Sequence, residues 1–151
     1  MLPRLLLTSM LSVTLAGCQT IFGPSEEHEL DDAWDHWLSL RIVDYRYEVI
    51  RSCYCGGPAV GQRVVVVVHD DVVVNAWYAQ TGEELPASAL QHLPTVDDLF
   101  LIVDDALRTG ADELDVRYDP SFGFPRLIEV DYQRHAVDDE LTVRADDLRP
   151  I

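Results

Sequence analysis

The sequence predicts an α+β fold in which a meandering antiparallel sheet of about six strands packs against two helices, in the order α-βββ-α-βββ. Two segments carry apolar residues at helical spacing, and six shorter segments have the alternation or the β-branched composition of strands. Short turns separate the strands within each set of three, which favours antiparallel pairing of consecutive strands. With 151 residues, the chain has the length of one ordinary domain.

The first helix is expected over about residues 26–41. Ser25 is the expected N-cap, and Glu26 and Glu27 follow it, where carboxylates interact favourably with the positive end of the helix dipole. The apolar residues recur at a spacing that places them on one face of a helix. They are Leu30, Ala33, Trp34, Trp37 and Leu38.

The period then changes to two, which predicts a long strand over about residues 45–55. The residues expected on one face are Tyr45, Tyr47, Val49, Cys53 and Cys55. The alternation slips only at Ile50 and Arg51. Gly56-Gly57-Pro58 is expected to end this strand, because glycine and proline interrupt regular structure.

Two further strands are expected over residues 60–68 and 72–78. The first contains five consecutive valines, Val64 to Val68, which place apolar side chains on both faces of the sheet. Strands buried on both faces read as continuous apolar runs. We therefore expect this strand to be central and covered on both sides.

The second helix is expected between Thr95, its N-cap, and Gly110, its C-terminal stop. Three more strands are expected over about residues 114–118, 127–132 and 140–145, separated by turn-forming segments. One helix followed by three strands thus occurs twice, which suggests a doubled unit.

The N-terminal segment has the pattern of a secretory signal peptide, with Arg4 before an apolar stretch that is too short to span a bilayer. Leu15-Ala16-Gly17-Cys18 follows, and it resembles the lipobox of bacterial lipoproteins. The resemblance implies cleavage before Cys18 and acylation of that cysteine. The expected organisation is a signal peptide at 1–17, a lipidated N-terminus and tether at 18–25, and a single α+β domain at 26–151.

The lipobox also implies a location. Two or three acyl chains hold a protein firmly on a membrane, whereas one chain binds only marginally. Gln19 follows Cys18 where an Asp would favour retention in the inner membrane of enteric bacteria. We therefore expect a cell-envelope protein, on the periplasmic face of the outer membrane if the source is Gram-negative.

Composition excludes several function classes. All 11 basic residues are Arg, so chemistry that requires a lysine amine, such as Schiff-base catalysis, is excluded. The formal net charge of −16 argues against binding nucleic acid. None of the common nucleophile, zinc-protease or dinucleotide motifs occurs. The sequence therefore identifies no catalytic residue and no cofactor, and it favours a protein that is not an enzyme.

Cys53 and Cys55 form a pair if Cys18 carries lipid. On a regular strand their Cα atoms would lie roughly 6.6–6.8 Å apart, at the upper limit for a disulfide. A disulfide relieved by a bend at the following glycines is the leading interpretation, and a thiol-redox switch, a thiolate metal site and two buried thiols stay open. Asp131, Asp138 and Asp139 are candidates for a cation site.

Much of the domain resembles a bacterial family catalogued as domain of unknown function 6174. The resembling segments are Thr95 to Phe100, Asp115 to Pro120, Gly123-Phe124-Pro125, Ile128 to Asp131, and Asp138-Asp139-Glu140, together with Tyr45-Arg46-Tyr47 and Cys53-Tyr54-Cys55. The resemblance covers about residues 33–147. It implies a secreted or lipid-anchored α+β domain, and it brings no established activity or catalytic residue.

These observations favour a non-catalytic, lipid-anchored envelope protein that acts as a binding or assembly module. Its expected partners are the membrane, through the N-terminal lipid, and another envelope protein. The alternative is a periplasmic thiol-redox or metal-handling protein that uses Cys53 and Cys55.

Overall fold

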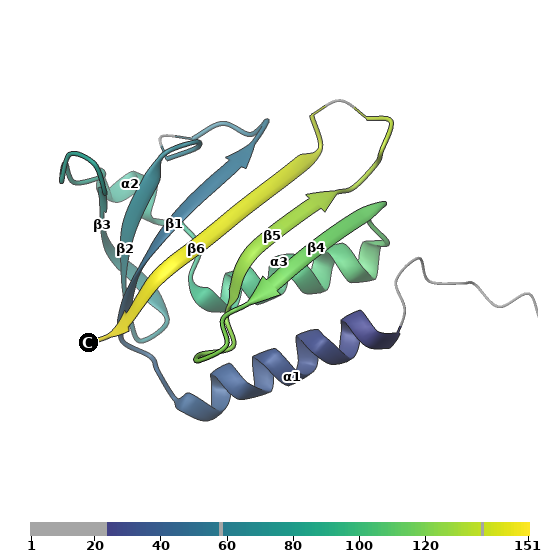
Figure 1. The fold of residues 1–151 in the computed structure, drawn as a ribbon. Helices are drawn as coiled ribbons and strands as arrows, with labels where there is room; N and C mark the ends of the chain where they lie inside the picture. Colours follow the sequence, from purple (N-terminus) through teal and green to yellow (C-terminus); the bar gives the residue numbers. More distant parts are fainter. Residues whose placement is uncertain (1–23, 58, 137) are drawn as a thin grey trace, which may run out of the picture.

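A computed structural model describes residues 24–57, 59–136 and 138–151, and it shows an α+β fold in the order α-βββ-α-βββ (Figure 1). A single-turn helix, α2, lies in the connection after the third strand. The elements are α1 (Pro24–Leu40), β1 (Tyr45–Cys53), β2 (Arg63–His69), β3 (Val72–Tyr78), α2 (Ala87–Leu90), α3 (Val96–Thr109), β4 (Glu113–Tyr118), β5 (Pro125–Asp131) and β6 (Glu140–Pro150). Helix α1 begins one residue before the predicted N-cap, Ser25.

The six strands form one sheet in the order β3-β2-β1-β6-β5-β4, and every neighbouring pair is antiparallel. Two meanders are thus joined where β1 and β6 run side by side at the centre (Figure 1). The first strand of the first meander is central, whereas β4, the first strand of the second, lies at an edge. Both meanders run in the same order across the sheet, β3-β2-β1 and β6-β5-β4, and the suggestion of a doubled unit stays a prediction.

The helices cover one face of the sheet. Helix α3 lies behind β4 and β5 in the view of Figure 1, and α1 runs beside it. One continuous hydrophobic core, from Leu30 to Leu148, joins these helices to the inner face of the sheet. Among the described residues, no helix covers the outer face of the sheet.

The expectation that the valine strand is central and covered on both sides is wrong. Val64, Val66 and Val68 are at most 1% exposed and face the helices. Val65 and Val67 point to the outer face and are only half-buried. Strand β2 lies second from the edge, and the apolar run reflects the β-propensity of valine as well as burial.

Two tyrosines of β1 hold the start of α3 against the sheet. The backbone N–H of Val96 donates to the hydroxyl of Tyr45 at 2.8 Å, and the hydroxyl of Tyr47 donates to the carbonyl of Pro94. Both tyrosines are 0% exposed. Thr95 caps α3 through a capping box with Asp98, as its place before the apolar stripe predicts.

Helix α1 attaches to α3 through its tryptophans. The ring of Trp34 stacks on Phe100 with centroids 5.1 Å apart, and Trp37 meets Tyr45 edge to face at 5.5 Å. Hydrogen bonds from both indoles lower the pKa of Asp97, but burial is the larger effect, and the pKa of this carboxyl is raised. Leu30, Ala33, Trp34 and Trp37 of the predicted α1 stripe therefore pack on the core. Leu38, the last member of that stripe, is 57% exposed and does not.

Gly123 marks the closest approach between the β4–β5 turn and α1. Its φ is +80°, and a Cβ at this position would lie 2.7 Å from the Ala33 carbonyl oxygen. We predict that Gly123→Ala destabilises the fold by about 2–4 kcal/mol, because backbone strain and the contact with α1 add. Urea unfolding measures this loss.

Gly82→Ala is the matched control, since Gly82 has φ +71° but open space around its Cβ position. This change should cost only the conformational part, about 1–2 kcal/mol. Equal losses at the two positions would contradict the close packing of the turn against α1.

Candidate functional site

A pocket of about 730 Å³ lies between the inner face of the sheet and the segment from α2 to α3, near the end of β1. The sheet contributes Val49, Val64 and Val143 to its walls, and α3 contributes Leu101 and Ile102. Leu101 is 51% exposed although it is apolar. The pocket is therefore an apolar hollow that opens to solvent, as small-molecule sites commonly are.

Arg51 is the basic residue on the pocket wall. It pairs with Val143 of β6 and so occupies an inward-facing position of β1. Its Nε is buried and has no hydrogen-bond partner among the described residues. Seven other arginines of that region form ion pairs with carboxylates, and Arg51 is not one of them. A buried guanidinium nitrogen without a hydrogen-bond partner is costly and calls for an explanation.

The break in the apolar alternation of β1 is the sequence signal for this site, although by itself it does not reveal a pocket. Apolar alternation in β1 slips at Ile50 and Arg51, and the structure shows that the strand itself continues in regular register through both. Arg51 thus takes a place on the inner face where an apolar residue would be expected. The break in the alternation therefore corresponds to a polar residue in the pocket wall and not to an irregularity in the strand.

Tyr132 adds a phenol to the same pocket. Burial, the largest effect, and the nearby Asp105 raise its pKa, and Arg51 lowers it in part. Since an unperturbed tyrosine already titrates near pH 10, the hydroxyl keeps its proton at neutral pH and can donate a hydrogen bond. His92 and Gln91 complete the polar side of the wall. Sequence analysis did not single out Tyr132, because the residues that surround it come from distant segments.

The cysteine pair lies at the rim of this pocket. The sulfur atoms of Cys53 and Cys55 are at bonding distance, and their Cα atoms lie 5.1 Å apart, within the range for a disulfide. This separation is shorter than a regular strand allows, so β1 ends at Cys53 and not at residue 55 as expected. The residues after the bend, Cys55, Gly56, Gly57, Ala59 and Val60, line the pocket.

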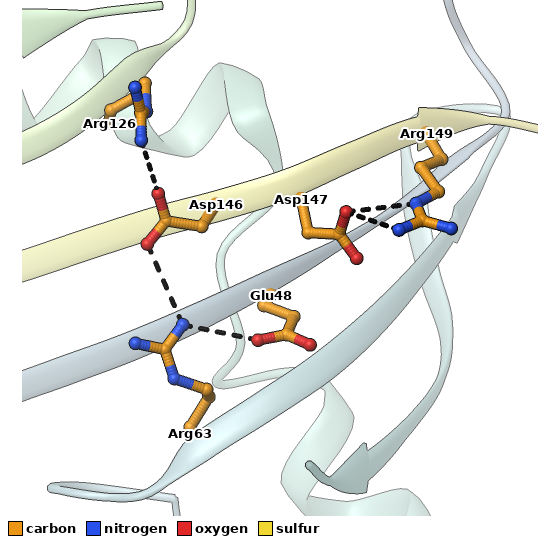
Figure 2. Close-up of polar contacts among 6 residues, drawn as sticks. All are labelled: Glu48, Arg63, Arg126, Asp146, Asp147 and Arg149. Atoms are coloured by element: carbon orange, nitrogen blue, oxygen red, sulfur yellow. Dashed lines mark hydrogen bonds and ion pairs between the residues drawn. The ribbon is translucent and has the colours of Figure 1, made fainter.

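The outer face of the sheet is occupied by ion pairs. Figure 2 shows Arg63 bridging Glu48, at 3.2 Å, and Asp146, at 3.7 Å, while Arg126 binds the other oxygen of Asp146 at 2.8 Å. These pairs cross β2, β1, β6 and β5. Exposed pairs of this kind each contribute little to stability. Asp147 pairs with Arg149 at 2.7 Å, so both carboxylates of Asp146-Asp147, near the end of β6, have arginine partners in the protein (Figure 2).

The three aspartates proposed for a cation are not assembled into a metal site. Asp131 ends β5, and Asp138 and Asp139 lie in the connection to β6. Oδ1 of Asp131 and both carboxylate oxygens of Asp139 are buried without a hydrogen-bond partner. Throughout the described ranges, however, no three or more His, Cys, Asp or Glu side chains are grouped so that they could hold a metal ion.

The predicted lipidation site, Cys18, lies outside the described residues, as do the signal peptide and the lipobox. Within the part of the chain that is described, no helix is long and apolar enough to cross a membrane.

The chain belongs to the family of unknown function DUF6174, whose model matches residues 29–150. The match confirms the resemblance seen in the sequence and spans almost the whole described fold. No curated protein and no solved structure matches the chain.

We predict that Cys53 and Cys55 are joined when the protein is isolated from its own compartment. Trypsin cleaves after Arg51 and Arg63 and releases one peptide that contains both cysteines. Without reduction this peptide should resist alkylation and be two hydrogen masses lighter than the dithiol. After reduction it should accept two alkyl groups. A peptide that is fully alkylated without reductant would contradict the disulfide.

Proposed function

We propose that this member of the DUF6174 family is a non-catalytic binding module held at the cell envelope by lipid on Cys18, and that the pocket beside Arg51 is its binding site. One observation carries the proposal: a hollow of about 730 Å³, walled in part by apolar residues of the sheet and of α3, holds an arginine whose Nε has no protein partner among the described residues. A few polar groups in a mostly apolar cavity are the usual design of a ligand site.

Two polar side chains of the pocket, Arg51 and Tyr132, are suited to recognition. A guanidinium stays protonated at every physiological pH. The phenol of Tyr132 also keeps its proton near neutrality, because its pKa is raised above an already high value. Neither group exchanges protons at neutral pH, so both act as fixed hydrogen-bond donors. This behaviour supports binding in preference to acid–base catalysis.

Filling the pocket should weaken binding. A chain beginning at residue 19, secreted so that the disulfide can form, contains every residue of the core found in the described region, from Leu30 to Leu148. We predict that it binds N-phenyl-1-naphthylamine, a neutral fluorescent apolar probe, saturably. Ala59→Trp should weaken this binding at least about tenfold, because the indole occupies space on the pocket wall.

Val74→Trp is the matched control, since Val74 is 45% exposed on β3 and does not line the pocket. It adds the same indole elsewhere on the surface. Thermal unfolding of both variants checks that each is folded. Absence of saturable probe binding to the unsubstituted chain, or equal weakening by the two substitutions, would contradict the proposed binding site.

The anchor is supported by the lipobox, Leu15 to Cys18. We predict that mass spectrometry of the full chain isolated from membranes finds a mature N-terminus at Cys18 carrying two or three acyl chains. Cys18→Ser should remove the acyl chains. An unmodified Cys18, or cleavage at another position, would contradict the anchor.

Thiol–disulfide exchange is the second candidate function, and the position of the cysteines favours it. Tyr54, between them, is 81% exposed, so a partner could approach the pair. In such an exchange two partner thiols would be oxidised to a disulfide while the Cys53–Cys55 bond is reduced to two thiols. A pair that stays oxidised in a reducing glutathione buffer would eliminate this candidate and leave the cysteines a structural role at the pocket rim.

A further inference from the structure

We propose that the pocket takes an anionic amphiphile, a carboxylate or phosphate head group on an apolar tail, and that Arg51 binds the head group. This inference rests on the binding site proposed above and specifies its ligand. It follows from the position of Arg51, from the carboxylates around it and from the walls that continue beyond it.

Arg51 has the properties of a residue that binds an anion. Arg51 is an inward-facing residue of β1 and is paired with Val143 of β6. Its side chain therefore enters the layer between the sheet and the helices. There Nε has no partner among the described residues. A guanidinium presents a planar set of donors that matches carboxylate and phosphate oxygens. An anion in the pocket would satisfy the donor that the protein leaves unpaired.

The carboxylates near the pocket do not take this role. Asp98 lines the pocket, but its Oδ2 already accepts hydrogen bonds from the backbone N–H and the hydroxyl of Thr95, at 2.8 and 3.0 Å. Asp105 also lines it, yet it forms no ion pair with Arg51 within the described region, and its charge acts on Tyr132. Arg41, Arg46 and Arg51 are the arginines of the described region that form no ion pair, and of these Arg51 lines the pocket.

The walls beyond Arg51 suit an apolar tail. Val49, Val64 and Val143 form the floor on the sheet, and Leu101 and Ile102 of α3 face them across the pocket. Burying methylene groups against these apolar walls is favourable, because it removes apolar surface from water. A polar solute would leave the walls in contact with water. The site therefore combines one cationic group with an extended apolar surface, which is the chemistry that recognises an amphiphilic anion.

The test compares four ten-carbon probes below their aggregation concentrations: decanoate, decyl phosphate, decan-1-ol and decyltrimethylammonium. Calorimetry on the chain beginning at residue 19 should show that both anions bind at least about tenfold more tightly than the alcohol and the cation. The relative affinity of decanoate and decyl phosphate then identifies which head group the pocket prefers. Equal affinity of alcohol and anions, or preference for the cation, would overturn the inference.

Arg51→Gln should reduce the affinity for both anions to that for decan-1-ol and leave the alcohol unchanged. Arg51→Lys, which keeps the charge but not the planar donor set, should retain only part of the preference. Arg46→Gln is the matched control, because Arg46 lies on the same strand but on the outer face, opposite Val67 of β2. It should bind all four probes as the unsubstituted chain does.

Binding of N-phenyl-1-naphthylamine separates the two levels of the proposal. If the unsubstituted chain binds this neutral probe but shows no preference for anions, the pocket is a binding site and the role of Arg51 is wrong. If the chain binds neither, the proposed function itself fails. Arg51→Gln that still binds the neutral probe is folded, so its loss of anion binding supports the inference.

Discussion

The attachment of α3 to β1 determines the arrangement of the whole domain. Tyr45 and Tyr47 are fully buried, and their hydroxyls meet the N–H of Val96 and the carbonyl of Pro94. Leaving either polar group unpaired inside the core would cost about 1–3 kcal/mol. The start of α3 is therefore fixed above the first half of β1, where Trp37 of α1 also packs on Tyr45.

The pocket follows from this attachment. Helix α3 begins over Tyr45 and Tyr47 and then runs toward β4 and β5 (Figure 1). Beside the second half of β1, the helix, the α2–α3 connection and the loop after Cys53 form the walls of the pocket. The inward-facing residue there is Arg51. A fold with a single helix layer and a sheet of this width thus keeps an opening at one end of its core. The outer face of the sheet carries charged side chains that are joined in ion pairs (Figure 2).

Local sequence patterns predicted most of the helices and strands, but not the strand order or the number of helix layers that cover the sheet. The limits of α3 and β3 could be read from the sequence because a capping box, a left-handed glycine and tight turns act over a few residues. The central place given to Val64 to Val68 was wrong, because strand order and the number of helix layers depend on contacts between distant segments. Arg51 shows the same limit: its break in the alternation was visible, whereas the pocket that explains it needs β1, β6 and α3 together.

The Nε–H of Arg51 offers the most direct test of this account. Its signal is observable in a proton–nitrogen correlation spectrum and is assigned by its loss in Arg51→Lys, which has no Nε. On addition of decanoate, the account predicts that the Arg51 signal shifts downfield and saturates with the binding curve, as expected when the orphan donor gains a charge-assisted hydrogen bond. An Nε–H signal that stays in place while decanoate binds would show that the anion is held elsewhere and would contradict the account.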